Sequence, residues 1–185
     1  MMRRALYLGR FQLFHLGHWD VLQHIDAQPD VDEIVIAIGS TQYDWQNKSP
    51  EWPWANNPFT YLERREMIER SIEGRGGLRK PWSLCGVPDT HEHESWFAGL
   101  VATVGEFACL YSSDPRERRF FDAHGKQGRD FPRRFSFHAG SIRKRIADGV
   151  DYRPFVPEGT ATVIERVDAR QRLLGLYARD LQGGG

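Results

Sequence analysis

One stretch near the start of the chain decides its fold: Gly9-Arg10-Phe11-Gln12-Leu13-Phe14-His15-Leu16-Gly17-His18. The apolar run before it predicts a β-strand, and the residues from Leu16 onward predict a helix. Backbone N–H groups and the positive end of the helix dipole meet at such a turn, and both favour an anion, above all a phosphate. His15 and His18 are three residues apart, so they share one face of the helix start.

The two histidines indicate the chemistry of phosphoryl or nucleotidyl transfer. Imidazole N–H groups donate hydrogen bonds to oxygens that gain charge in the transition state, while Gly9 and Gly17 let a bulky group approach the backbone. Two other interpretations of these residues stay open: a buried histidine pair that caps the helix, and a zinc site. A zinc site needs a third protein ligand, and the neighbouring sequence offers no obvious one.

The decapeptide resembles the H-x-G-H signature of the nucleotidylyltransferase superfamily. Its fuller form, G-R-F-Q-x-F-H-x-G-H, resembles the archaeal-type nicotinamide mononucleotide (NMN) adenylyltransferases. The resemblance implies an enzyme that transfers AMP from ATP to NMN by direct in-line displacement, with a Mg²⁺ ion held by the phosphates and not by protein side chains. The catalytic residues it implies are His15, His18, Arg10 and Arg143. The ATP-binding residues it implies are Gly9, Arg10, Phe11, His15, Gly17, His18, Ser141, Ile142 and Arg143.

The composition favours one cytoplasmic domain. The chain has 185 residues, with 25 Lys plus Arg and 25 Asp plus Glu, so no global charge attracts nucleic acid or an anionic membrane. The length predicts a single domain over residues 1–181 and a flexible tail over 182–185. No apolar run approaches the roughly 20 residues of a membrane span. Cys85 and Cys109 are predicted to be core thiols and not a disulfide.

Alternating strand and helix signals predict an α/β fold. Strands are expected at 5–9, 33–38, 82–87, 107–111 and 134–137, and helices at 16–27, 60–73, 95–103 and 115–123, with more helix after Ser141 and after Pro157. The helix over 60–73 starts with Thr60 and Glu63, the pattern of a capping box, within a stretch that resembles the family's N-P-F-T-x-x-E-R. Regular alternation implies a Rossmann-like, doubly wound parallel sheet with helices on both faces. Ligands bind such sheets at the carboxyl ends of the strands.

Residues 40–56 do not fit this pattern. They include Trp45, Trp52 and Trp54 among polar residues, and they are too many for an ordinary strand–helix loop. A long loop with three tryptophans is either a lid or an interface patch. We expect a lid that orders when ligand binds, because closure excludes water from the transfer.

A second motif resembles the superfamily signature I-S-x-T-x-I-R. Residues 139–145 read Ala-Gly-Ser-Ile-Arg-Lys-Arg, and the Ile and Arg positions match. His138 and Gly140 stand where the family has Ser and Thr, so Ser141 supplies the hydroxyl one place later. A hydroxyl and N–H groups at a helix start, with Arg143 one turn on, predict a second phosphate cradle.

The resemblance places the acceptor pocket at residues 87–96. Trp96 matches the tryptophan that stacks on nicotinamide in the resembled family, and Asp89 matches its aspartate. An aromatic face over a pyridinium ring is a cation–π arrangement, worth about 2 kcal/mol when desolvated. His93 stands where the family has asparagine. NMN binding is therefore expected at Phe14, Asp89, His93 and Trp96, while a core role for Trp96 and metal binding by residues 91–94 stay open.

Two other functions also stay open. Within the same class, the acceptor is another small metabolite, such as pantetheine phosphate, FMN or a choline-type phosphate, because the second signature and His93 depart from the family. From another class, the chain is a nucleotide-sensing module without turnover, although binding alone does not need both His15 and His18. The resemblance implies ATP and NMN as small-molecule partners and a homo-oligomer, and it does not separate NMN from its nicotinate analogue.

Overall fold

In a computed structural model of the chain, the described residues are 2–90 and 92–182, and they form two compact units. Unit 1 contains the chain up to Arg10 and residues 19–40 and 78–134, and unit 2 contains residues 11–18, 41–77 and the chain from Phe135 onward. The expectation of one domain over residues 1–181 stays a prediction. Of the expected tail, Gln182 closes the last helix, and residues 183–185 lie outside the described residues.

Unit 1 is built on a five-stranded parallel sheet. Its strands are β1 (Arg4–Gly9), β2 (Glu33–Ile38), β3 (Trp82–Gly86), β4 (Cys109–Tyr111) and β5 (Gln127–Arg129). The spatial order β3-β2-β1-β4-β5 is that of a doubly wound sheet, in which the strand order reverses beside β1. The expected Rossmann-like α/β fold is therefore confirmed.

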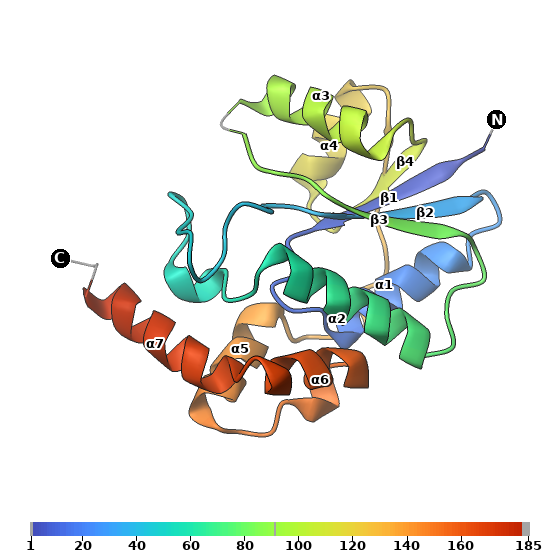
Figure 1. Cartoon of the computed structure of the whole chain (residues 1–185). Coiled ribbons are helices and arrows are strands. Elements are labelled where there is room, and N and C mark those ends of the chain that lie inside the picture. Colours follow the sequence, from blue (N-terminus) through green and yellow to red (C-terminus); the bar gives the residue numbers. More distant parts are fainter. Residues whose placement is uncertain (1, 91, 183–185) are drawn as a thin grey trace. The chain divides into compact units, whose positions relative to one another are not determined.

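Helices cover both faces of this sheet. Helix α1 (Leu16–Asp26) lies on one face, and α3 (His93–Val104) and α4 (Pro115–Ala123) lie on the other (Figure 1). Residues 34–38 of β2 are all buried, as a strand covered on both faces requires. Each large aliphatic side chain buried in this way contributes about 1.5–3 kcal/mol. Cys85 and Cys109 are free thiols; Cys109 is buried, Cys85 is half-buried against the core, and burial raises the pKa of both.

The expected strand at residues 134–137 is wrong. Its alternating Phe135 and Phe137 gave a strand pattern, but in the structure these rings pack on each other at 5.0 Å in irregular backbone, and Phe137 also contacts Phe155. The fifth strand is instead Gln127–Arg129, which has no apolar alternation. A salt bridge from Arg129 to Asp30 holds this short strand at the sheet edge.

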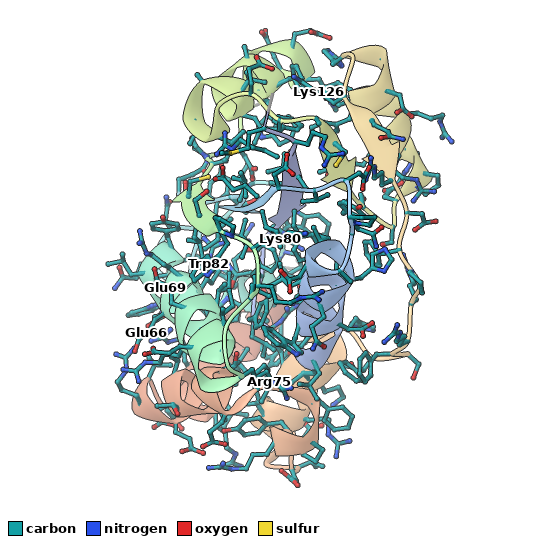
Figure 2. All side chains as sticks on the ribbon, turned by 90° about the vertical axis from the view of Figure 1, so that its right-hand side faces the viewer. Glu66, Glu69, Arg75, Lys80, Trp82 and Lys126 are labelled. Atoms are coloured by element: carbon teal, nitrogen blue, oxygen red, sulfur yellow. The ribbon has the colours of Figure 1, made fainter. Side chains whose placement is uncertain are left out.

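Unit 2 is helical. Its elements are α2 (Tyr61–Gly74), the 3-10 turns η1 (Trp54–Asn56) and η2 (Arg153–Phe155), and the helices α5 (Ala139–Asp148), α6 (Glu158–Arg166) and α7 (Ala169–Gln182). Glu66 and Glu69 project from α2 and pair with arginines one turn away (Figure 2). Within the described residues, no helix has the length and apolar character needed to cross a membrane.

The capping box predicted for α2 is confirmed. The backbone N–H of Thr60 donates to Glu63 Oε2 at 2.9 Å, and the backbone N–H of Glu63 donates to Thr60 Oγ1 at 3.2 Å. In the last turn of α2, the hydroxyl of Ser71 lies 3.1 Å from that of Thr160, and this buried contact joins α2 to α6. These contacts fix the start and the packing of α2.

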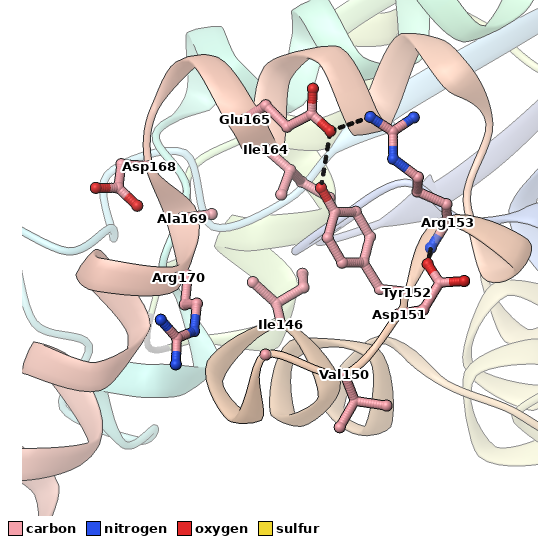
Figure 3. A pocket seen from close by; sticks show the side chains of 11 residues that line it. Ile146, Val150, Asp151, Tyr152, Arg153, Ile164, Glu165, Asp168, Ala169 and Arg170 are labelled. Atoms are coloured by element: carbon pink, nitrogen blue, oxygen red, sulfur yellow. Dashed lines mark hydrogen bonds and ion pairs between the residues drawn. The ribbon is translucent and has the colours of Figure 1, made fainter.

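A cavity of about 400 Å³ opens where the end of α5 meets η2, α6 and α7 (Figure 3). Its wall carries Glu165, which accepts hydrogen bonds from Tyr152 and Arg153. Asp168, at the corner between α6 and α7, has a φ of 47°. The cavity lies at the carboxyl end of α5, away from the signature residues at its start.

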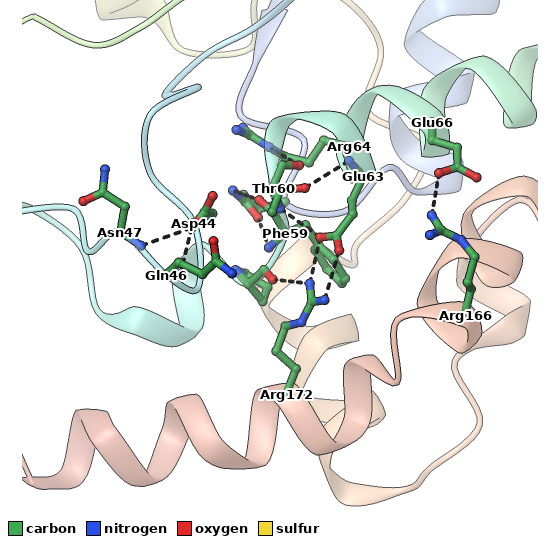
Figure 4. A network of polar contacts seen from close by, with 12 residues as sticks. Asp44, Gln46, Asn47, Phe59, Thr60, Glu63, Arg64, Glu66, Arg166 and Arg172 are labelled. Atoms are coloured by element: carbon green, nitrogen blue, oxygen red, sulfur yellow. Dashed lines mark hydrogen bonds and ion pairs between the residues drawn. The ribbon is translucent and has the colours of Figure 1, made fainter.

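The Trp-rich segment contacts α7. Arg172 lies over the Trp45 ring at 5.0 Å, and Arg179 lies over the Trp54 ring at 5.3 Å. Asp180 accepts hydrogen bonds from the backbone N–H groups of residues 54 and 55, at the start of η1. Arg172 also pairs with Glu63 of the α2 cap (Figure 4). The segment is docked in this structure, and its role as a lid stays a prediction.

Candidate active site

His15 and His18 form a reciprocal pair at the start of α1. The backbone N–H of each histidine donates to Nδ1 of the other, both at 3.3 Å. The two rings stack, with 3.7 Å between centroids and 17° between planes. The ring contact gives the His15 N–H a partner that a helix start otherwise lacks, and the His18 N–H also donates to the His15 carbonyl at 2.9 Å. Because each Nδ1 accepts a hydrogen bond, each ring carries its proton on Nε2.

Both imidazoles are neutral at physiological pH. Burial, followed by the proximity of His138, lowers the pKa of His15 to about 4. Burial and the neighbouring His15 hold the pKa of His18 well below its usual 6.5. A neutral ring with its proton on Nε2 donates one hydrogen bond from that atom. Each ring of the pair therefore has one N–H donor, on Nε2, and its use by a ligand stays a prediction.

Gly17 keeps this pair in place. A Cβ atom at this position would lie 3.0 Å from both Cε1 and Nδ1 of His15, closer than most real Cβ contacts. A side chain here would have to displace the ring from its stack. The sequence predicted that Gly17 gives a ligand access to the backbone, and the structure adds this positioning role.

Phe11 and Phe14 enclose His18 with aromatic rings. The Phe11 ring meets His18 edge-on at 5.0 Å, and the Phe14 ring stacks on it at 5.6 Å. Phe11 has a φ of 47°, a strained conformation for a bulky residue that persists only where its surroundings impose it. Both side chains are buried. Their expected contacts, Phe11 with ATP and Phe14 with NMN, stay predictions.

Arg143 fastens the loop of the decapeptide. Its guanidinium donates to the carbonyl of Gln12 at 2.7 Å and to Asn56 Oδ1 at 3.1 Å. The Gln12 side chain donates to the carbonyl of Phe59 at 3.2 Å and accepts from its N–H at 3.0 Å. Sequence reasoning missed Gln12 and Asn56. Gln12 is a polar residue between two apolar neighbours, and this pattern was the available signal for a buried amide with a structural role.

The start of α5 carries the rest of the second signature. The backbone N–H of Ser141 donates to Nδ1 of His138 at 3.3 Å, and Ser141 Oγ donates to the His138 carbonyl at 2.7 Å. The side chain of Ile142 is fully buried, and its backbone N–H donates to the His138 carbonyl at 3.3 Å. The ATP contacts expected for Ser141, Ile142 and Arg143 stay predictions.

In unit 1, two strand ends carry predicted site residues. Gly9 closes β1, its carbonyl accepts from the N–H of Gly39 at 2.9 Å, and Arg10 follows it, half-buried. Ser40, two residues after β2, donates from Oγ to Asp89 Oδ2 at 2.5 Å. Ser40 is buried with a φ of 53°. Sequence reasoning missed it, because nothing local in the sequence announces a positive φ at a serine.

The side chain of Trp96 lies at the boundary between the core and the surface. Its ring lies half-buried on α3, 6.4 Å from Phe120 and 6.3 Å from Phe121. His93 is exposed at the first turn of the same helix. Part of the indole thus packs in the core, and part is available to a ligand. The contacts of Trp96, His93 and Asp89 with NMN stay predictions.

Comparison with known proteins decides the family. Residues 6–104 match the Cytidylyltransferase-like family. The nicotinamide-nucleotide adenylyltransferase of Methanolobus tindarius is 34% identical over 97% of this chain and 97% of its own length. That of Archaeoglobus fulgidus is 32% identical over 96% and 99%. The chain belongs to the nicotinamide-nucleotide adenylyltransferase family. It is a nucleotidyltransferase, and the resemblance drawn from its motifs is confirmed.

Solved structures show the same adenylyltransferase fold. The bifunctional NMN adenylyltransferase/ADP ribose pyrophosphatase of Francisella tularensis, complexed with AMP and a Mn ion, aligns with a TM-score of 0.72 at 19% identity. The alignment covers 95% of this chain, which spans about half (52%) of that chain. The Plasmodium falciparum nicotinic acid mononucleotide adenylyltransferase, complexed with NaAD, aligns at 0.66 and 12% identity over 92% of this chain and 98% of its own.

Metal binding by protein side chains was an alternative for two regions. Among residues 2–90 and 92–182, no three His, Cys, Asp or Glu side chains gather as a group that could hold a metal ion. His91, part of the alternative at residues 91–94, lies outside the described residues. The His15–His18 pair instead directs both Nδ1 atoms at backbone N–H groups.

Proposed function

We propose that this chain transfers the adenylyl group of ATP to NMN, forming NAD and pyrophosphate. An oxygen of the NMN 5′-phosphate attacks the α-phosphorus in line, the bond from that phosphorus to the oxygen bridging to the β-phosphate breaks, and pyrophosphate leaves. No covalent enzyme intermediate forms, so positioning and charge stabilisation carry the catalysis. The observation that carries the proposal is the neutral, stacked His15–His18 pair in a member of this family.

In this proposal, the two imidazoles bind phosphate oxygens of ATP. His15 and His18 donate from Nε2, with His18 at the α-phosphate, where charge grows as the transition state forms. N–H groups at the start of α1 and its helix dipole add to this attraction. Arg10 and Arg143 bind the triphosphate and the departing pyrophosphate through guanidinium N–H groups.

When bound with ATP, a Mg²⁺ ion would supply charge neutralisation for the departing pyrophosphate. The described residues fit an ion held mainly by phosphates and water. Neutral imidazoles and guanidinium groups suit phosphate oxygens, whereas a protein cage for a hard cation needs several carboxylates, and those residues bring no such group together.

For the acceptor, the proposal assigns the nicotinamide ring to Trp96. The half-buried indole packs against Phe120 and Phe121 on one side. This contact already restricts its side-chain conformations, so less conformational entropy is lost when a ligand ring stacks on it. Asp89, held by Ser40, and His93 bind polar groups of NMN, and Phe14 supports the acceptor side. This assignment distinguishes NMN from acceptors that lack a pyridinium ring.

An acceptor screen tests the proposal. Pyrophosphate release is measured with ATP, Mg²⁺ and, in turn, NMN, its nicotinate analogue, FMN and pantetheine phosphate. We expect a pyridine nucleotide to be used best, and the Trp96→Ala variant to raise KM for NMN about tenfold, the loss of ~1–2 kcal/mol of stacking, with KM for ATP unchanged. Faster turnover of FMN or pantetheine phosphate, or ATP binding with no transfer to any acceptor, would overturn it.

A further inference from the structure

The start of α5 repeats the construction of the start of α1. In both, a histidine precedes the helix, a glycine follows two places later, and the N–H of the next residue donates to the histidine Nδ1 at 3.3 Å. A Cβ atom at Gly140 would lie 3.1 Å from Nδ1 of His138, as one at Gly17 would lie 3.0 Å from Nδ1 of His15. The same local geometry therefore orients both imidazoles.

Between Ser141 and His138 at the start of α5, the imidazole and not the hydroxyl is the available donor. Ser141 Oγ directs its proton to the His138 carbonyl at 2.7 Å and accepts from the His138 N–H at 3.3 Å, so this hydroxyl serves the cap. Because His138 Nδ1 accepts a hydrogen bond, its proton lies on Nε2. The ring itself is exposed.

Contacts within unit 2 join the two helix starts. Phe137, the residue before His138, meets the His15 ring edge-on at 5.5 Å. Arg143, one turn into α5, donates to the Gln12 carbonyl in the loop that leads to His15. The proximity of His138 also contributes to the lowered pKa of His15. His138 is therefore a neighbour of the histidine pair, on the His15 side.

We infer that His138 is a third phosphate-binding imidazole, which donates from Nε2 to the pyrophosphate portion of ATP. The inference rests on the proposed function, in which His18 binds the α-phosphate. His138 borders His15 and not His18, so it reaches the phosphates that leave. In the signature of the resembled family a serine hydroxyl stands at this position. Here the imidazole of His138 donates in its place, while Ser141 completes the cap.

Binding measurements on the full chain test this inference separately from turnover. Asn is among the most favourable N-cap residues. His138→Asn therefore keeps a side-chain acceptor for the cap and removes the Nε2–H donor. We expect this variant to bind a non-hydrolysable ATP analogue and pyrophosphate about tenfold more weakly by calorimetry, the loss of one charge-assisted hydrogen bond, with AMP binding and Tm unchanged. His24→Asn, a histidine on α1 outside the site, is the matched control and should bind all three as the unsubstituted protein does.

A measurement on the unsubstituted protein guards against a variant that does not fold. The His138 ring resonance, assigned by its loss in His138→Asn, should shift on addition of pyrophosphate and not on addition of AMP. An unshifted resonance, or unchanged ATP and pyrophosphate affinity in a folded His138→Asn, overturns the inference even if NAD is formed. If affinity depends on His138 but no acceptor is adenylylated, the inference stands and the proposed function fails.

Discussion

His18 is half-buried, has a lowered pKa and carries its proton on Nε2, so it is a donor that needs no positive charge. In the proposed reaction its bond to the α-phosphate strengthens as charge develops, so His18→Ala should lower kcat by ~10²–10³ and change ATP affinity by only a few-fold. NAD formation and calorimetric titration with an ATP analogue measure the two effects, with His24→Ala as the control. Near-normal turnover in His18→Ala would remove this residue from catalysis.

Gly17 tests whether the stacked geometry itself matters. Gly17→Ala places a methyl group 3.0 Å from the His15 ring and should lower kcat about tenfold or more, although alanine is the better helix former by ~1 kcal/mol. Gly99→Ala in α3 is the matched control, because a Cβ there meets nothing within 4 Å. It should keep full activity and an equal or higher Tm. Equal activity of both variants would show that the stack tolerates displacement.

Among the elements, α2 depends on one carboxylate that serves two partners. Glu63 accepts from the Thr60 N–H and pairs with both terminal nitrogens of Arg172, at 2.7 and 3.0 Å, with only 14% of either side chain exposed. Removing it loses the cap and leaves a largely buried guanidinium without this partner. Glu63→Ala should therefore lower the free energy of unfolding by about 3–5 kcal/mol, measured by urea denaturation.

The same helix supplies the control for Glu63. Glu69 pairs with Arg65 at 2.8 Å on the exposed side of α2 (Figure 2). Exposed pairs of this spacing contribute about 0.3–0.5 kcal/mol, so Glu69→Ala should change stability by no more than that. A similar loss in the two variants would mean that burial of the Glu63–Arg172 pair adds nothing.

The Trp-rich segment between Tyr43 and Trp54 is predicted to be a lid, so its role depends on a change in its mobility when ligand binds. If it orders over bound ligand, limited proteolysis within it should slow when ATP and NMN are both present, because cleavage requires local opening. Asp180→Ala removes the acceptor for two N–H groups at η1 and should speed cleavage without ligand. Equal rates with and without ligand would contradict the lid and favour an interface patch.

For the whole molecule, the buried histidines link stability to pH. Their pKa values are lowered on folding, to about 4 for His15. Below pH 6.5 the unfolded chain therefore binds protons that the folded chain does not, and stability falls as pH falls. His15 should cost up to about 1.4 kcal/mol per pH unit between pH 6 and 5, and His18 should act in the same direction. Urea denaturation at pH 7.5, 6 and 5 should show a shallower fall for His15→Asn, and an unchanged slope would contradict the buried neutral state.

Local signals in the sequence determined the elements and the motif. The apolar run and decapeptide marked β1 and the start of α1, and the Thr60–Glu63 pattern marked the start of α2. Strand–helix alternation was enough to predict the doubly wound parallel sheet, because parallel strands require crossover connections. The capping box, the motif and each strand or helix depend on residues close in sequence, and the alternation follows from the order of those elements, so these features can be recognised without knowledge of distant contacts.

Long-range packing decided the rest. The phenylalanines at 135 and 137 alternate as in a strand, but Phe137 packs on rings elsewhere in unit 2 and Phe135 packs on Phe137, and the edge strand formed where Arg129 reaches Asp30. The Gln12–Arg143 contact joins residues 131 positions apart, and the tautomers of the histidines follow from hydrogen bonds that exist only in the folded chain. The sequence alone determined the motif and with it the candidate residues for phosphate binding, and only tertiary structure decided how their donors are oriented, because burial and hydrogen-bond partners are properties of the folded state.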